Sequence, residues 1–164
     1  MTKGYRVLRE PGARPPFARL IACALACLVL VIALPAAAEP IASGAIDVID
    51  GDTIMVRGHS RQVRLLGFDT PETGFGARCI AEFTLASKAT QRLRQIVADG
   101  GLDLRLVACP CRPGTEGTPA CNDGRACGVL AAKGQEVSAL MIGEGLARPA
   151  HCGKACLRDR RSWC

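Results

Sequence analysis

The sequence predicts an α+β fold that is mainly β. Apolar segments at residues 45–49, 53–56 and 62–68 are separated by short turns that contain glycine, a pattern typical of a meander of strands. A segment with apolar residues at helical spacing follows, from about residue 78 to residue 98. Strands in succession followed by a helix are typical of an α+β class.

The second half of the chain continues with strands. Residues 102–108 alternate weakly between apolar and polar positions, and residues 128–132 form a further strand-like segment. The excursion between them, residues 109–127, is too polar and too rich in glycine to order itself by burial, so we expect it to be crosslinked. A short helix is expected at residues 136–144, and a basic tail at residues 149–164 ends the sequence.

Residues 1–38 are typical of an export signal peptide. A basic lead is followed by an apolar run, residues 20–34, and by small residues after which cleavage is expected at Ala38. The run is short for a membrane span of about 20 residues, although an uncleaved anchor stays an alternative. We therefore expect one mature domain, residues 39–164, in the periplasm or outside the cell. We expect it to be a monomer without stable membrane association once the signal is removed.

Charge and aromatic content limit how the mature domain could bind a polyanion. The formal net charge is +6, but removal of the signal, with its five basic residues and one acid, leaves about +2. Any attraction for nucleic acid must therefore be local. An aromatic content of 4% argues against a base-stacking platform as the main means of binding.

Cysteine usage also indicates export. Outside the signal the sequence contains an even, dense set: Cys79, Cys109, Cys111, Cys121, Cys127, Cys152, Cys156 and Cys164. Such a set predicts disulfides in an oxidising compartment. Cys109 with Cys127 would join two strand ends, Cys111 with Cys121 would close the inner loop, and the final cysteine could be tied to Cys79, although many other pairings are possible. A zinc site in the loop is the alternative, but its Cys-Pro-Cys spacing is narrower than zinc sites use.

Two acid-bearing segments carry the strongest functional signal. The first is Asp-Gly-Asp-Thr at residues 50–53, and the second is Asp-Thr-Pro-Glu at residues 69–72, after a strand that contains Arg64. Carboxylates and a carbonyl oxygen suit a hard cation such as calcium, and an arginine can grip a phosphate with two hydrogen bonds. Together they are the parts of a metal-assisted phosphodiester cleavage. Taken singly, each segment could be only a turn or a helix entry, and Arg64 only a solvated charge.

These motifs resemble the staphylococcal-nuclease-like (thermonuclease) family. The resemblance rests on Asp-Gly-Asp-Thr at residues 50–53, Arg-Leu-Leu-Gly-Phe-Asp-Thr-Pro-Glu at residues 64–72, the helix, Gly124-Arg125 before a strand, and Gly-Leu-Ala-Arg at residues 145–148. It covers about residues 46–149 in the right order. The first two motifs together are specific, whereas Gly124-Arg125 alone is weak.

The resemblance implies a five-stranded OB-type barrel with two to three helices. It also implies a calcium-dependent nuclease, a hydrolase that acts on DNA and/or RNA, with Ca²⁺ as its cofactor and nucleic acid as its partner. By position, Asp52 and Asp69 would be calcium carboxylates, and Thr70 would add its backbone carbonyl. Asp50 would be a further acid near the metal, beyond the direct ligands.

The resemblance also assigns the residues that act on the substrate. Arg64 and Arg125 would hold the scissile phosphate. Glu72 would position or deprotonate the attacking water. The family's tyrosines after Gly-Leu-Ala are absent, and His151 lies there instead, either as a polar substitute that binds substrate or as a simple tail residue. Asp123 replaces an aromatic residue expected before the Gly-Arg pair and places a negative charge beside the incoming phosphate.

Two other classes of function stay open. A non-catalytic OB-fold module could bind a polyanion or a protein partner. A calcium site could also serve only to stabilise an exported scaffold, although this leaves the two arginines without a purpose. Degenerate nuclease-like modules usually lose their acids or arginines, and every matched position is filled here, which favours an enzyme.

Overall fold

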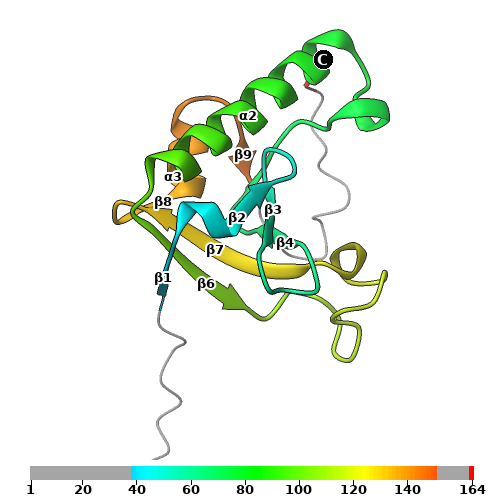
Figure 1. The fold of residues 1–164 in the computed structure, drawn as a ribbon. Helices are drawn as coiled ribbons and strands as arrows, with labels where there is room; N and C mark the ends of the chain where they lie inside the picture. Colours follow the sequence, from blue (N-terminus) through cyan, green and yellow to red (C-terminus); the bar gives the residue numbers. More distant parts are fainter. Residues whose placement is uncertain (1–37, 151–162) are drawn as a thin grey trace, which may run out of the picture. The chain divides into compact units, whose positions relative to one another are not determined.

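A curled mixed sheet carries most of the fold, and one long helix packs across it (Figure 1). The computed structural model describes residues 38–150 and 163–164. The main sheet has the strand order β1-β6-β7-β4-β3-β2, and β8 pairs with β7. Its strands are β1 (Glu39–Ile41), β2 (Ile46–Val48), β3 (Thr53–Val56), β4 (Val63–Leu65), β6 (Leu102–Val107), β7 (Ala126–Ala132) and β8 (Gln135–Glu136).

The predicted meander is present with shorter strands. β2 pairs antiparallel with β3, and β3 pairs antiparallel with β4. The third expected strand, residues 62–68, is divided because Gly67 adopts φ 94° and turns the chain. Its last part becomes β5 (Phe68–Asp69), which pairs with β9 (Arg148–Pro149) in a separate small sheet.

Strand β7 lies between the two halves of the main sheet. It pairs antiparallel with β6 over six positions and parallel with β4, where Val63 lies opposite Ala126. A Cβ on Gly128 would come within 2.9 Å of Val63, so glycine permits this close approach. Within the described residues β1 and β2 end the sheet without pairing with each other, which makes a half-barrel. The mainly β, α+β class is confirmed, and closure into a five-stranded OB-type barrel stays a prediction.

Two α-helices complete the described fold, close to the expected ranges. They are α2 (Ile80–Asp99) and α3 (Val137–Gly143). Arg92 of α2 ties them together by donating three hydrogen bonds of 2.6–3.0 Å to the Glu144 carboxylate. One face of α2 is buried against the sheet, through Ala86, Ala89, Leu93, Ile96 and Val97. This burial keeps the long helix fixed over the core.

The helix α2 begins in a tightly bonded corner. Cys79 caps it, since its sulfur accepts from the Glu82 N–H at 3.4 Å, while Glu82 Oε2 accepts from the Arg78 N–H at 2.8 Å. The arrangement is similar to a capping box, except that the glutamate accepts from the residue before the cap instead of from the cap itself. The hydrogen bond from Arg78 lowers the pKa of Glu82 despite its burial.

Three of the expected crosslinks are confirmed: Cys109–Cys127, Cys111–Cys121 and Cys79–Cys164. The four loop cysteines are therefore committed to disulfides and are not thiolate ligands for zinc. Disulfides indicate an oxidising environment outside the cytoplasm. Export itself stays a prediction, because the signal up to residue 37 lies outside the described residues, as do His151, Cys152 and Cys156.

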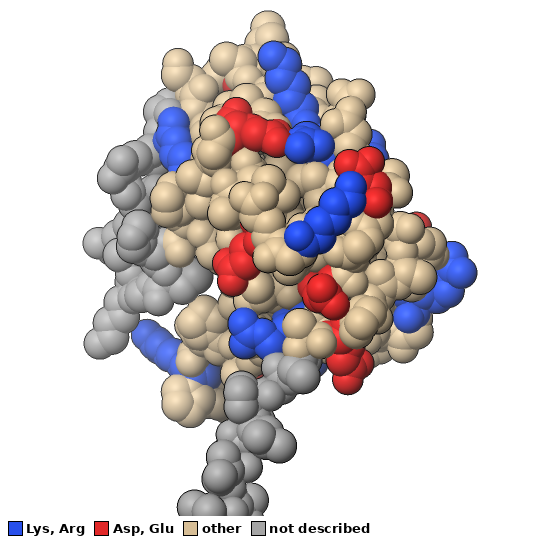
Figure 2. All heavy atoms as spheres, turned by 90° about the vertical axis from the view of Figure 1, so that its left-hand side faces the viewer, with Lys and Arg blue, Asp and Glu red and all other residues tan. Residues whose placement is uncertain are grey.

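No helix in the described part of the chain combines the length and apolar character that a membrane crossing requires. On the face shown in Figure 2, Lys and Arg side chains alternate with Asp and Glu and form no continuous basic stripe among the described residues. Any attraction for a polyanion through this face would therefore be local, as the small net charge of residues 39–164 predicts.

We predict that the long-range crosslink contributes more to stability than the short one. Cys79 and Cys164 are 85 residues apart, whereas Cys111 and Cys121 are 10 apart. Loop entropy predicts a loss of about 4.5 kcal/mol for the double serine variant of the first pair and about 3 kcal/mol for the second. Urea unfolding of both variants measures the difference. A larger loss from the short pair would contradict this account.

Candidate functional site

A close backbone contact brings the two acid-bearing segments together. A Cβ on Gly51 would lie 2.8 Å from Thr70 Oγ1, so a larger residue would push the segments apart. The turn is fixed by the Asp52 N–H, which donates to Asp50 Oδ1 at 3.0 Å. The Leu65 N–H donates to the Asp52 carbonyl at 2.8 Å and joins the same turn to β4. Glycine between the two aspartates is therefore required by the packing of the site.

The carboxylate of Asp52 is buried at this contact. Its Oδ2 accepts from the N–H and the hydroxyl of Thr70, at 3.3 and 3.2 Å, and lies 2.9 Å from Arg64 Nη2. Its Oδ1 accepts from the Thr53 hydroxyl at 3.1 Å. Burial raises the pKa of Asp52 to about 6, and the opposite charge of Arg64 limits the rise.

Arg64 points into the site, as the alternation of its strand allows. Val63 and Leu65 on either side are buried in the core, so Arg64 projects from the other face of β4. Its Nη2 lies 2.9 Å from Asp52 Oδ2 and 2.6 Å from Asp69 Oδ1. Burial lowers the pKa of Arg64, but the two carboxylates outweigh it and raise the pKa above its usual value. One guanidinium nitrogen therefore joins both predicted metal carboxylates.

The donor set is compatible with one calcium ion. Carboxylate oxygens that contact the same nitrogen are close to each other, and calcium takes oxygen ligands at about 2.3–2.6 Å in flexible geometry. Thr70 directs its N–H and hydroxyl at Asp52, while Asp50 is engaged with the backbone of the turn. Among residues 38–150 and 163–164, no group of three or more His, Cys, Asp or Glu side chains is arranged so that it could hold a metal ion by itself. Asp52 and Asp69 would hold the ion with help from carbonyl oxygens and solvent.

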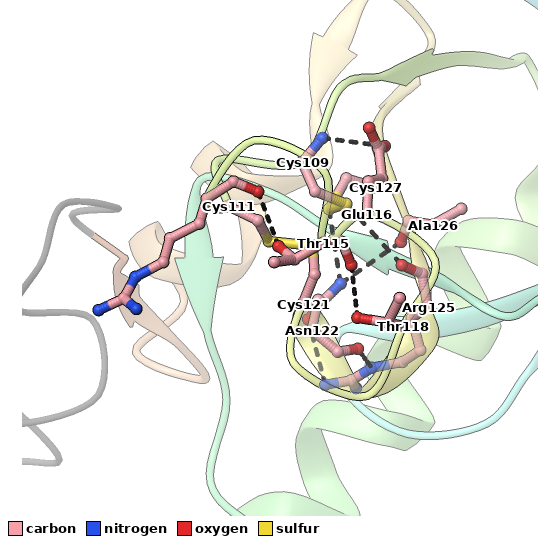
Figure 3. Close-up of a disulfide and its surroundings, with 11 residues drawn as sticks. Cys109, Cys111, Thr115, Glu116, Thr118, Cys121, Asn122, Arg125, Ala126 and Cys127 are labelled. Atoms are coloured by element: carbon pink, nitrogen blue, oxygen red, sulfur yellow. Dashed lines mark hydrogen bonds between the residues drawn. A yellow bond between two sulfur atoms is a disulfide. The ribbon is translucent and has the colours of Figure 1, made fainter.

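Arg125 reaches the same site, through Thr53, from the end of the crosslinked loop. Figure 3 shows Arg125 in this loop, beside Asn122. It follows the single turn η3 (Asn122–Gly124), whose residues Asn122 and Asp123 both adopt positive φ. Its Nη1 donates to Thr53 Oγ1 at 3.1 Å. Its Nε and Nη2 donate to Asn122, and Nη2 also lies 3.2 Å from the exposed carboxylate of Asp123. The structure therefore brings together Asp52, Asp69, Thr70, Arg64 and Arg125.

Glu72 lies two residues beyond Thr70 on a loop anchored to the long helix. Its backbone N–H donates to the carboxylate of Glu82, and its side chain packs beside Gly76, where a Cβ would come within 3.1 Å. Gly76 thus leaves room for the Glu72 side chain. These contacts fix the loop, and the role of Glu72 toward water stays a prediction.

Two residues of the network are not among the predicted site residues. Thr53 and Asn122 hold Arg125 through side-chain hydrogen bonds. Asn122 had a sequence signal, because Asn-Asp-Gly favours the left-handed backbone that this turn adopts. Thr53 belongs to the Asp-Gly-Asp-Thr motif, but nothing near it in the sequence indicates its contact with Arg125, which lies 72 positions away.

The fold and site define an α+β domain with an acid pair between two arginines. A scan against protein-family models finds no match, and a search of curated proteins finds none either. The functional conclusion therefore rests on this geometry and on the motifs themselves.

We predict that Asp52 makes the calcium-free protein less stable as the pH rises. Its folded pKa of about 6 lies above its usual 3.8, so its favourable contribution is complete below about pH 4 and is lost as the pH rises through 6. Asp52→Asn, which is neutral throughout, should match wild type at pH 4 and exceed it by about 1–3 kcal/mol at pH 7.

Urea unfolding in EDTA at both pH values measures this difference. Asp47→Asn on β2 is the matched control, because Asp47 is exposed and should show no such gain. Equal stability changes for Asp52→Asn at pH 4 and pH 7 would contradict the prediction.

Proposed function

We propose that this protein is an exported, calcium-dependent nuclease that hydrolyses phosphodiester bonds in DNA and/or RNA. The observation that supports this most is the contact of Arg64 Nη2 with both Asp52 and Asp69. Arg125 is joined to the Asp52 carboxylate through the Thr53 hydroxyl. A pair of acids and two arginines from separate segments of the chain thus converge at one place.

The two arginines would bind the scissile phosphate. Attack by water on phosphorus builds negative charge on the equatorial oxygens, and fixed guanidinium donors stabilise that charge as it forms. Calcium, when bound, would supply further positive charge to the phosphate oxygens. Arg64 is paired with both acids in this structure, so a cation on those acids would release its donors toward the substrate.

Glu72 is the proposed partner of the attacking water. It would accept the water proton as the oxygen–phosphorus bond forms. The bond to the leaving oxygen would then break, and that oxygen would take up a proton from solvent. A carboxylate aimed at the phosphate instead would repel it, so Glu72 must face the water. Its loop is held by the hydrogen bond between its backbone and Glu82, which limits its freedom to move.

One observation favours the alternative, a non-catalytic OB-fold module that binds a polyanion or a protein partner. Asp123 lies 3.2 Å from Arg125 Nη2 and competes with phosphate for that arginine. Its side chain is 85% exposed, however, so solvent weakens the pairing, and an incoming phosphate can displace it. We therefore expect this contact to lower the affinity for substrate without preventing catalysis.

We predict calcium-dependent cleavage of denatured DNA by the mature protein. Cleavage should stop in EGTA, and Glu72→Gln should lower kcat by about 10²–10⁴-fold because the proton acceptor is lost. Gel analysis of cleavage and calcium titration of both proteins measure this. A folded wild type that binds calcium or DNA without cleaving would refute the nuclease function and favour the binding module.

A second prediction concerns Arg125. Arg125→Ala should lower kcat/KM by about 10²–10³-fold, as loss of one donor to a developing oxyanion does, while calcium affinity stays nearly unchanged. Arg112→Ala is the matched control, because it removes an exposed arginine from the same crosslinked loop. Isothermal titration gives the calcium affinity. An equal loss of calcium binding and turnover would refute the role assigned to Arg125.

A further inference from the structure

The hydroxyl of Thr53 lies between the two halves of the site. Thr53 begins β3 and is 1% exposed. Its Oγ1 lies 3.1 Å from Asp52 Oδ1 and 3.1 Å from Arg125 Nη1. A guanidinium only donates and an ionised carboxylate only accepts, so the single hydroxyl proton goes to Asp52 and a lone pair accepts from Arg125. The direction of both hydrogen bonds is therefore fixed.

This hydroxyl orients the end of Arg125 that faces the acids. The other donors of Arg125 face its own loop, at Asn122 (Figure 3) and at the exposed Asp123. The contact with Thr53, whose side chain is buried, is the one that points across to β3. Without it, the pull of Asp123 on Nη2 would no longer be opposed, and the guanidinium would rotate toward the loop.

The same hydroxyl also donates a hydrogen bond to the carboxylate of Asp52. Oδ2 of Asp52 is satisfied by Thr70 and Arg64, whereas the Thr53 hydroxyl donates to Oδ1. One ion pair, between Arg64 and Asp52, and two hydrogen bonds, from the Thr53 hydroxyl to Asp52 and from Arg125 to Thr53, therefore connect the two arginines. A buried carboxylate oxygen that loses its donor is destabilised, so loss of the hydroxyl would disturb both ends of this connection.

We propose that Thr53 is a positioning residue whose hydroxyl sets the orientation of Arg125 toward the substrate phosphate and couples it to the acid pair. The inference rests on the nuclease function proposed above and names a residue on which that site depends. Valine has nearly the same shape as threonine and forms strands as well, so the hydroxyl can be removed with little change in packing. Serine keeps the hydroxyl and loses the methyl group.

The kinetic test compares Thr53→Val with Thr53→Ser. Loss of a hydrogen bond to a charged group predicts a fall in kcat/KM on denatured DNA of about 10- to 100-fold for the valine variant. The serine variant should retain most of the activity. In an Arg125→Ala background Thr53→Val should have a much smaller further effect, because the two residues act as a unit. Equal losses for valine and serine, or an undiminished loss in that background, would overturn the proposal.

A second measurement reads the orientation directly. In ¹⁵N NMR the Nη hydrogens of Arg125, assigned by their loss in Arg125→Lys, should be resolved in wild type and Thr53→Ser and averaged by rotation in Thr53→Val. Unchanged signals in the valine variant would overturn the proposal.

If Thr53→Val does not fold, Thr53→Ala takes its place. If wild type cleaves no DNA, the nuclease function fails, and these spectra still decide the role of Thr53.

Discussion

The buried carboxylate of Asp52 is the interaction on which the candidate site depends. It accepts hydrogen bonds from Thr70 and Thr53 and pairs with Arg64, so one side chain joins β3, β4 and the segment that follows β5. A charge with so little access to water is costly, and its raised pKa shows that its neighbours offset only part of that cost. A buried charge whose cost is only partly offset is typical of functional sites, where stability is given up for reactivity.

Disulfide bonds stabilise the loop of residues 109–127, where too few side chains are buried to order the chain. The segment that carries Arg125 is mostly exposed, and its small apolar cluster consists of cysteines with Leu66 and Val107. Two disulfides hold its ends together, and hydrogen bonds within the loop from Thr115 and Thr118 shape the rest. An arginine that must reach a site on another strand is thus carried on a short, crosslinked support.

Local patterns in the sequence predict the parts of the site that local rules determine. The Val63-Arg64-Leu65 alternation allows an arginine that faces away from the core, and Gly51 between two aspartates marks a tight turn. Other features escape such rules. The polar segment Glu39–Ile41 forms a strand because it pairs through its backbone with β6, and Gly67 divides a strand that looks continuous. The contact of Thr53 with Arg125 depends on distant pairing that no local motif encodes.

The parallel pairing of β4 with β7 also fixes when the site can form. Residue 63 meets residue 126 only after the chain has passed through α2 and β6, and contacts so far apart in sequence are slow to close. Until then the acids and Arg64 have no second arginine beside them. A chain still emerging during synthesis would therefore lack half of its phosphate-binding groups, and by the mechanism proposed here it would stay harmless to nucleic acids until β7 had docked.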